Sequence, residues 1–171
     1  MREIHLFQPL TIKDVTFKNR IGVSPMCQYS AEDGEVNNWH LVHLGSRAIG
    51  GAGLVIVEAT AVAPEGRISL QDCGLWNDLQ EQKLRPIVEF LKSAGTVAAI
   101  QIGHAGRKAS TALPWEGGGP LESGAWPVVG PSSIAFSSKH QVPHELTEQE
   151  LESVVADFAA AAQRARNAGF Q

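Results

Sequence analysis

The sequence contains few cysteines, no cluster of basic residues and no long apolar run. Its two cysteines, Cys27 and Cys73, are too few for a disulfide framework and fit a reducing cytoplasm. A net charge of -4 without any Lys/Arg cluster offers nothing that would attract nucleic acid or an anionic membrane. No run could span a bilayer, and residues 1–5 lack the apolar core of a signal peptide. We therefore expect a cytoplasmic globular protein with no nucleic-acid or membrane partner.

Apolar runs and amphipathic segments alternate along the chain. Each apolar run is typical of a buried strand and is followed by a segment with helical periodicity: 21–26 then 38–49, 54–57 then 79–93, and 97–102 then 145–171. Strands that alternate with helices predict a parallel sheet with right-handed crossovers. A doubly wound sheet and a (β/α)8 barrel both fit this order. Three such units are too few to close a barrel, which takes about 250 residues.

Capping residues set the expected helix ends. Asn77 and Asp78 predict the N-cap of the second helix, and Pro86 is expected to kink or shorten it. Thr147 followed by Glu150 predicts a capping box for the last helix. At helical spacing, the last helix is expected to bury Leu151, Val154, Val155, Phe158, Ala161, Ala162 and Ala165.

Two further segments flank the strand–helix units. Residues 1–20 predict an N-terminal cap made of two short strands around a Lys13–Asp14 turn. Residues 111–145 are rich in proline, glycine and serine, and a connection of this length is usually functional or a small subdomain. Trp115 and Trp126 lie in it, and we expect them to pack a cap over the mouth of the fold.

The expected strand ends carry most of the chemically useful side chains. Ligands bind at the carboxyl ends of strands in parallel α/β folds. The segments there are 24–29, 58–60 and 101–108, and they supply a thiol, a phenol, carboxamides, a carboxylate, an imidazole and two cations. The small residues Ala59, Gly103 and Ala105 would leave room for a flat ligand. The sequence has no P-loop and no dinucleotide glycine fingerprint after the first strand.

These strand-end segments, together with the pair before the first strand, resemble the Old Yellow Enzyme family. In chain order the four motifs are Asn19–Arg20, 24–29, 57–60 and 101–108. The pair Cys27 and Tyr29 resembles the thermophilic-like bacterial branch of its ene-reductases. The resemblance implies an α/β fold, an FMN-dependent (β/α)8 TIM barrel, of which this chain would hold the first three βα units, the cap and the long loop. It also implies that NADPH reduces the flavin, which then reduces the activated C=C bond of an enone or enal.

The resemblance also implies roles for individual residues. Cys27 would lie near the reactive edge of the flavin and modulate its potential, and Tyr29 would line the substrate pocket, so both are expected to be catalytic. Gln101 would hydrogen-bond the pyrimidine side of the flavin, because a carboxamide both donates and accepts. The full set implied to bind the cofactor is Ser24, Pro25, Met26, Cys27, Ala59 and Gln101.

Other parts of the family's site are implied to follow residue 171. These are the His-x-x-His or His-x-x-Asn pair that binds the substrate carbonyl oxygen, a Tyr proton donor, an Arg beside the flavin and the phosphate-binding loops. We therefore expect residues 1–171 to be the N-terminal portion of one barrel domain, supplying one wall of the flavin site and inactive alone. A complementary chain or segment and a homo-oligomer of the complete enzyme are the expected partners.

Two other functions are open. The chain could be a non-catalytic partial barrel that assembles with itself or a complementary chain as a structural or binding module. The second possibility is a related flavin barrel with a different substrate, a dienoyl thioester. The Cys27 and Tyr29 pair argues against a reductase of that kind.

Several titratable residues have competing interpretations. Glu58 could form a structural pair with an Arg or Lys, or act directly in the site. His40 and His43 have helical spacing, but no Cys, Asp or Glu lies at ligand spacing, so we expect ordinary packing and no metal. Cys73 is expected to be a loop residue without a role.

The polar residues after the third strand are likewise ambiguous. We expect His104 to organise the loop after that strand. Arg107 and Lys108 are either solvated charges or a guide for NADPH phosphate or substrate.

Overall fold

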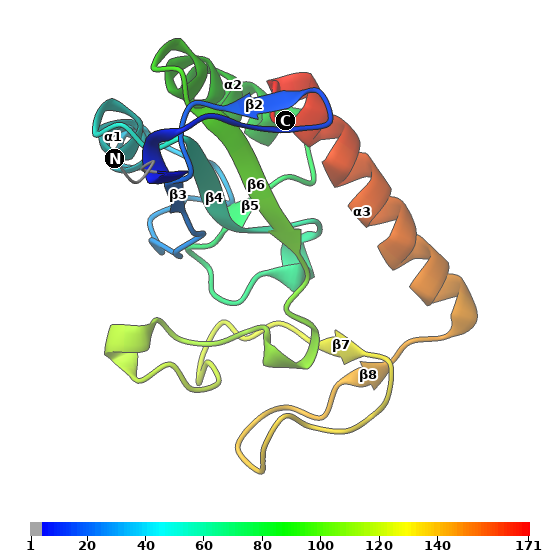
Figure 1. Cartoon of the computed structure of the whole chain (residues 1–171). Coiled ribbons are helices and arrows are strands. Elements are labelled where there is room, and N and C mark those ends of the chain that lie inside the picture. Colours follow the sequence, from blue (N-terminus) through cyan, green and yellow to red (C-terminus); the bar gives the residue numbers. More distant parts are fainter. Residues whose placement is uncertain (1–4) are drawn as a thin grey trace.

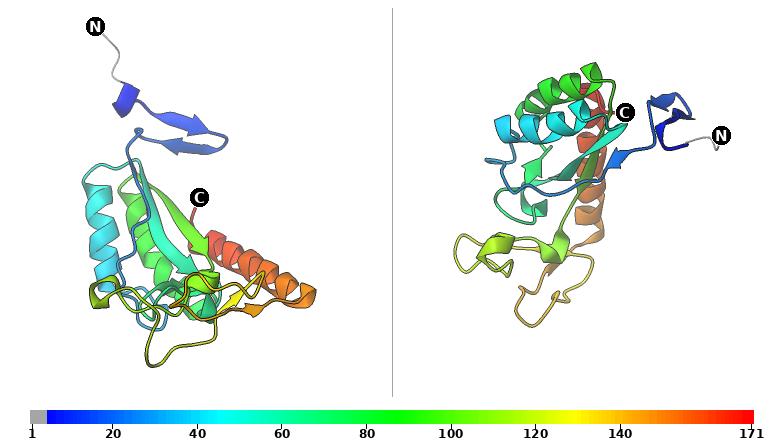
Figure 2. Two further views of the ribbon diagram at one scale, coloured as in Figure 1. Left: turned by 90° about the horizontal axis from the view of Figure 1, so that it is seen from below. Right: turned by 60° about the vertical axis from the view of Figure 1, so that its left-hand side comes forward.

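The structure is a computed structural model that describes residues 5–171. Residues 1–4, which belong to the segment expected to lack a signal-peptide core, lie outside the described residues. The chain begins with the 3-10 helix η1 (His5–Phe7) and a hairpin of β1 (Leu10–Ile12) and β2 (Val15–Phe17). This hairpin stands at the N-terminal end of the sheet, apart from the helices, as Figure 2 shows. The predicted N-terminal cap is confirmed over these strands.

A parallel sheet forms the centre of the molecule (Figure 1). Its middle strand is β4 (Leu54–Ala61), which lies between β3 (Gly22–Val23) and β6 (Val97–Gly103). The short strand β5 (Cys73–Gly74) pairs with the far end of β4, on the side opposite to β6. Because all these strands are parallel, their carboxyl ends point toward the long loop below the sheet in Figure 1.

Helices α1 (Asn38–Ile49), α2 (Asp78–Ser93) and α3 (Glu148–Ala168) follow the strands in the predicted order. Asn37 and Asn77 cap the first two helices through their side-chain oxygens, and the predicted box of Thr147 and Glu150 caps the third. α2 continues past Pro86, so the predicted shortening is wrong. In the described part of the chain no helix is both long and apolar enough to cross a bilayer.

Two strand boundaries differ from the sequence expectation. The first strand is limited to Gly22–Val23, and residues 24–29 after it are irregular. β4 extends to Ala61, so Glu58 lies inside the strand and not after it. A register shift between Val57 and Thr60 lets the pairing with β6 resume beyond Glu58. An irregularity of this kind re-aims the side chains beside it.

The last helix buries less than its periodicity predicts. Ala161, Ala165 and Ala168 are buried, because the C-terminal half of α3 packs against α2 and β6. Leu151 and Val155 are 42% and 69% exposed, because the first half of α3 runs beyond the sheet (Figure 1). The predicted burial of Leu151, Val155 and Ala162 is therefore wrong in this structure.

The remaining elements lie in the connections. They are η2 (Pro64–Gly66), η3 (Gly106–Lys108), η4 (Pro114–Glu116) and the paired strands β7 (Val129–Gly130) and β8 (His144–Glu145). The long loop holds η4, β7 and β8 at the carboxyl ends of β4 and β6 (Figure 1). Within it, Trp126 Nε1 donates to the Glu65 carbonyl at 2.9 Å, whereas Trp115 is 67% exposed.

Candidate functional site

The predicted site segments meet at the carboxyl ends of the parallel strands. Residues 24–29 follow β3, Ala59 lies on β4 and Gln101 lies on β6. The sheet therefore brings together the residues that the sequence singled out, as expected for a parallel α/β fold. They divide into two sides: a closed side around Glu58 and an open side around Gln101.

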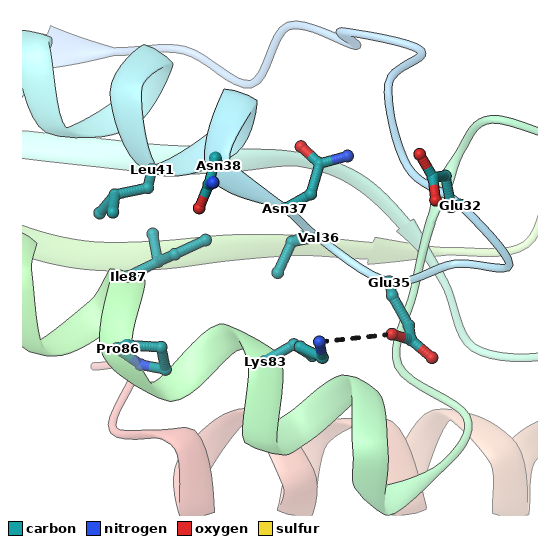
Figure 3. A pocket seen from close by; sticks show the side chains of 9 residues that line it. All are labelled: Glu32, Glu35, Val36, Asn37, Asn38, Leu41, Lys83, Pro86 and Ile87. Carbon is teal, nitrogen blue, oxygen red and sulfur yellow. Dashed lines mark ion pairs between the residues drawn. The ribbon is translucent and has the colours of Figure 1, made fainter.

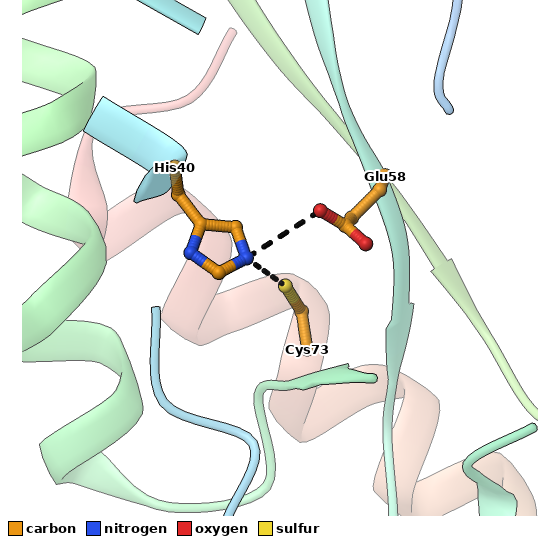
Figure 4. Close-up of side chains that lie close together, drawn as sticks. All are labelled: His40, Glu58 and Cys73. Carbon is orange, nitrogen blue, oxygen red and sulfur yellow. Dashed lines mark hydrogen bonds and ion pairs between the residues drawn. The ribbon is translucent and has the colours of Figure 1, made fainter. Parts of the chain in front are cut away.

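The closed side is built on three buried side chains from different elements (Figure 4). Glu58 on β4 has its Oε1 3.5 Å from Nε2 of His40 on α1. The same Nε2 lies 3.4 Å from Sγ of Cys73 on β5. Glu58 Oε2 accepts the Gln28 backbone N–H at 2.7 Å. Of the two interpretations of Glu58, the structural pair with an Arg or Lys is wrong, because the side chain beside its carboxyl group is His40 of α1.

Cys73 and His40 lie in surroundings that differ from those the sequence predicted. Cys73 is fully buried on a strand, not an incidental loop residue. His40 has both a carboxylate and a thiol beside it, although none lies at ligand spacing in the sequence. The ligand atoms of His40, Glu58 and Cys73 all lie within 4.8 Å of one another, an arrangement that could hold a metal ion.

The contacts of His40 Nδ1 orient the ring within the cluster. Nδ1 accepts the Asn37 backbone N–H at 3.1 Å, which favours the neutral tautomer with its proton on Nε2. Nδ1 also lies 3.2 Å from Asn37 Oδ1, which accepts from a protonated Nδ1 in the other tautomer. With the proton on Nε2, the ring faces Glu58 and Cys73 as a donor.

Burial determines the charge of this cluster. Desolvation raises the pKa of Glu58 to about 7, partly opposed by the hydrogen bond from the Gln28 amide. Desolvation, with a smaller effect of His43, lowers the pKa of His40 to about 4. Burial also raises the pKa of the Cys73 thiol well above its usual range. At neutral pH His40 and Cys73 are consequently uncharged.

The thiol and phenol predicted to be catalytic lie beside this cluster. Burial first, and then the carboxylates of Asp72 and Glu58, raise the pKa of the Cys27 thiol, which is therefore neutral at physiological pH. Burial, followed by the neighbouring Cys27, raises the pKa of Tyr29. The Tyr29 ring meets Trp115 edge to face, with 5.8 Å between the ring centroids. Trp115 thus reaches back from the long loop to the site segment.

The open side contains a pocket of about 190 Å³ between β4 and β6. Its lining includes Ala59, Gln101, Gly103 and His104. Gln101 is exposed, and a Cβ built on Gly103 would meet nothing within 4 Å. His104 Nδ1 accepts the Gly106 N–H at 3.0 Å, as expected of a residue that organises this loop, and its buried Nε2 has no hydrogen-bond partner in the described structure.

The two cations after β6 contact the long loop. The guanidinium of Arg107 donates to the Ile134 carbonyl at 3.2 Å, and Lys108 Nζ lies 4.5 Å from the centroid of the Phe136 ring. Both charges therefore have a structural partner in the loop.

A second pocket of about 390 Å³ lies between the start of α1 and α2 (Figure 3). An ion pair of Glu35 with Lys83, 3.8 Å apart, borders it. None of the predicted site residues lines this pocket, and it offers neither a thiol nor an imidazole. The strand-end pocket therefore fits the predicted chemistry better.

Residues 5–171 match the model of the NADH:flavin oxidoreductase / NADH oxidase family. This chain belongs to that family. Two curated relatives are the NADPH dehydrogenases of Bacillus cytotoxicus, 47% identical over 96% of this chain, and of Listeria welshimeri, 51% identical over 96%. The chain spans about half the length of these relatives, 44% and 46%.

Solved structures show the same fold. Morphinone reductase superposes with a TM-score of 0.83 at 27% identity, covering 96% of this chain and 46% of its own. Its complex with tetrahydroNAD superposes with a TM-score of 0.81 at 28% identity, covering 98% of this chain and 48% of its own. The structural neighbours are TIM barrels of the Old Yellow Enzyme type, so the three strand–helix units described above correspond to part of such a barrel. The expected family and fold class are confirmed.

The open side fits the flavin that the family name implies. Small side chains at Ala59 and Gly103 leave a flat surface, and the exposed carboxamide of Gln101 can both donate to and accept from a ring edge. On the segment that follows β3, Met26 is 47% exposed and Pro25 is half-buried. The sequence motifs singled these residues out as candidates, but the spacing of His40 and Cys73 gave no sign that they lie beside Glu58.

Proposed function

We propose that this chain forms one wall of an FMN site in an NADPH-dependent reductase of activated C=C bonds. The remainder of the site would come from the part of the barrel that the longer relatives possess. The observation that carries the proposal is the open pocket at the ends of β4 and β6, with Ala59, Gly103 and Gln101 on its lining. The matching family and the NADPH dehydrogenases among the relatives support it.

The residues of this chain would have distinct tasks. Ser24, Pro25 and Met26 would lie along the flavin, and Gln101 would hydrogen-bond its polar edge. Bound FMN would supply hydride transfer from NADPH to the β-carbon of an enone or enal. The neutral Cys27 thiol would adjust the flavin potential, and Tyr29 would orient the substrate from the closed side.

We also propose a role for the loop 111–145 as a cap over the site. The edge-to-face contact between Trp115 and Tyr29 supports it, because it joins the loop to the substrate side of the rim. The complete enzyme is proposed to be a homo-oligomer. By itself this chain would lack turnover, because it covers less than half of each relative's length.

The test combines this chain with a complementary polypeptide. Purified chain is titrated with FMN, alone and mixed with the part of the Listeria welshimeri NADPH dehydrogenase that follows the matched segment. We expect flavin to co-purify with the mixture and NADPH oxidation to depend on 2-cyclohexenone. A mixture that assembles but excludes FMN would contradict the proposal. A colourless homo-oligomer of this chain that refuses the complementary part would support the alternative structural module.

Two matched substitutions test the pocket itself. Gly103 lies two residues from Gln101 on β6, so a Cβ added at Gly103 would point to the same face of the sheet as the Gln101 side chain. Gly103→Ala should weaken FMN binding by the mixture about tenfold, equivalent to about 1.4 kcal/mol. Gly119→Ala also adds a methyl group into open space, but in the long loop, and should leave FMN affinity unchanged. Equal affinities for the two variants would place the flavin elsewhere.

A further inference from the structure

The buried cluster of His40, Glu58 and Cys73 is connected to the site through the backbone of residues 27–29. Glu58 Oε2 accepts the Gln28 amide at 2.7 Å. The neighbouring backbone amide of Tyr29 also favours the charged form and lowers the pKa of this carboxyl group. The buried carboxyl group therefore holds the segment at the Gln28 amide.

The backbone conformation at Tyr29 requires such a constraint. Its φ is 50°, in the left-handed region that costs a residue with a side chain roughly 1–2 kcal/mol. A left-handed residue turns successive amides toward the same side, forming a concavity that binds anions. In this protein the carboxyl group of Glu58, which β4 presents beside its register shift, lies at this turn. The hydrogen bond from the Gln28 amide to Glu58 thus offsets part of the cost of the left-handed conformation at Tyr29.

Two further groups lie against Glu58. His40 Nε2 lies 3.5 Å from Glu58 Oε1 and 3.4 Å from Cys73 Sγ, and the Cys73 thiol lowers the pKa of the carboxyl group. His40 is itself oriented by the Asn37 N–H at its other nitrogen. Figure 4 shows the three side chains converging from α1, β4 and β5. The carboxylate consequently has little freedom to move.

We propose that Glu58 is the positioning residue for the segment Cys27–Tyr29: with His40 and Cys73 behind it, its side chain holds the backbone amide of Gln28, between the thiol and the phenol, and thereby places both. The catalytic meaning of this placement rests on the proposed function. The placement itself is a property of this chain without flavin, so it can fail or succeed independently of that function.

Asp72 provides a matched control for charge. Asp72 and Glu58 are the carboxylates whose charge raises the pKa of the Cys27 thiol. Asp72, however, accepts from the Ile68 backbone N–H at 2.7 Å and from Ser69 Oγ at 2.8 Å, and not from residues 27–29. Asp72→Asn therefore removes a nearby charge without removing the acceptor of the Gln28 amide.

The single tyrosine of the chain makes the placement measurable. Chain labelled with 3-fluorotyrosine gives one ¹⁹F resonance, from Tyr29. Glu58→Gln leaves one acceptor oxygen, which cannot serve the Gln28 amide and the donors on the side of His40 and Cys73 together, because the NH2 group only donates. We expect a second or exchange-broadened resonance in this variant and a single sharp one in Asp72→Asn. A single sharp resonance in folded Glu58→Gln would overturn the proposal.

Thiol reactivity gives a second readout. In a Cys73→Ser background Cys27 is the only thiol, and its alkylation rate by iodoacetamide is followed against pH. Both Glu58→Gln and Asp72→Asn should move the midpoint to lower pH, because each removes a negative charge near the sulfur. Only Glu58→Gln should also make the reaction biphasic, since only that variant frees the segment. Monophasic alkylation in both variants would mean that Glu58 affects Cys27 only through its charge. That result would contradict the positioning role.

A milder pair of variants decides the matter if Glu58→Gln does not fold. Cys73→Ser keeps a hydrogen-bond donor to the carboxylate, whereas Cys73→Ala removes it. We expect the serine variant to keep the sharp Tyr29 resonance and the alanine variant to broaden it. Identical ¹⁹F spectra for the two would exclude the cluster from control of the segment.

Discussion

The two sides of the strand-end rim differ in how their polar groups are satisfied. On the closed side, Glu58 accepts the Gln28 amide and is surrounded by buried donors from α1 and β5. On the open side, Gln101 is exposed and His104 Nε2 has no partner in the described part of the chain. The chain thus satisfies the polar groups of one side with its own atoms and leaves polar groups of the other side facing a pocket. The difference separates groups that hold the site together from groups that line the pocket.

The largest expected effect comes from removing the centre of the closed side. Glu58→Ala leaves the Gln28 amide, the His40 ring and the Cys73 thiol without their acceptor. We expect the free energy of unfolding to fall by about 3 kcal/mol or more, because each unsatisfied buried group costs about 1–3 kcal/mol. Urea denaturation followed by circular dichroism measures it. Gln101→Ala on the open side should change stability by less than about 0.5 kcal/mol. Equal losses would remove the distinction between the sides.

The next effect is in the pH dependence of stability. Folding raises the pKa of Glu58 from 4.5 to about 7, so its contribution is full below pH 4.5 and is lost as the pH rises toward 7. Folding lowers the pKa of His40 from 6.5 to about 4, so its contribution is full above pH 6.5 and is lost as the pH falls. Between pH 4.5 and 6.5 the two slopes have opposite signs and offset each other.

Single substitutions should therefore expose one slope each. In Glu58→Gln, stability should fall by on the order of 2 kcal/mol as the pH is lowered across this window, because only His40 titrates. In His40→Gln, stability should fall by a similar amount as the pH is raised. Chemical denaturation at both ends of the window measures the slopes. Slopes of the same sign in the two variants would show that these groups do not titrate as described.

A smaller effect distinguishes two glycines near His104. A Cβ on Gly66 would lie 2.8 Å from His104 Cδ2, so Gly66→Ala must displace the ring. We expect a loss of about 1–3 kcal/mol, the range for overpacking. Gly103→Ala meets nothing within 4 Å and should leave the melting temperature nearly unchanged. A larger loss for Gly103→Ala would mean that the open side is more tightly packed than the structure shows.

The smallest effect concerns the link between the loop and the closed side. Trp115→Ala removes the edge-to-face contact with Tyr29 and should cost about 0.5 kcal/mol, the low end for aromatic pairs, because Trp115 is 67% exposed. The ¹⁹F resonance of Tyr29 should shift but stay single. Splitting of that resonance would assign the placement of Tyr29 to the loop as well as to Glu58.

Much of the fold could be predicted because its signals are local. The alternation of apolar runs and helical periods predicted the strand and helix order, and Asn77 and Thr147 marked helix starts that the structure confirms. The burial along α3 could not be predicted, because periodicity shows which face is apolar but not how far the helix overlaps its neighbours. Leu151 and Val155 lie on that face and are still exposed.

The candidate site divides in the same way. The sequence by itself determined which segments lie at the carboxyl edge of the parallel strands, because the strand order follows from local patterns, although β3 ends earlier and β4 later than those patterns predict. Only the tertiary structure decided that His40, Glu58 and Cys73 meet, since they come from a helix and two strands and have no characteristic spacing. It also decided which groups are charged, because burial, and not residue type, moves the pKa of Glu58 up and that of His40 down.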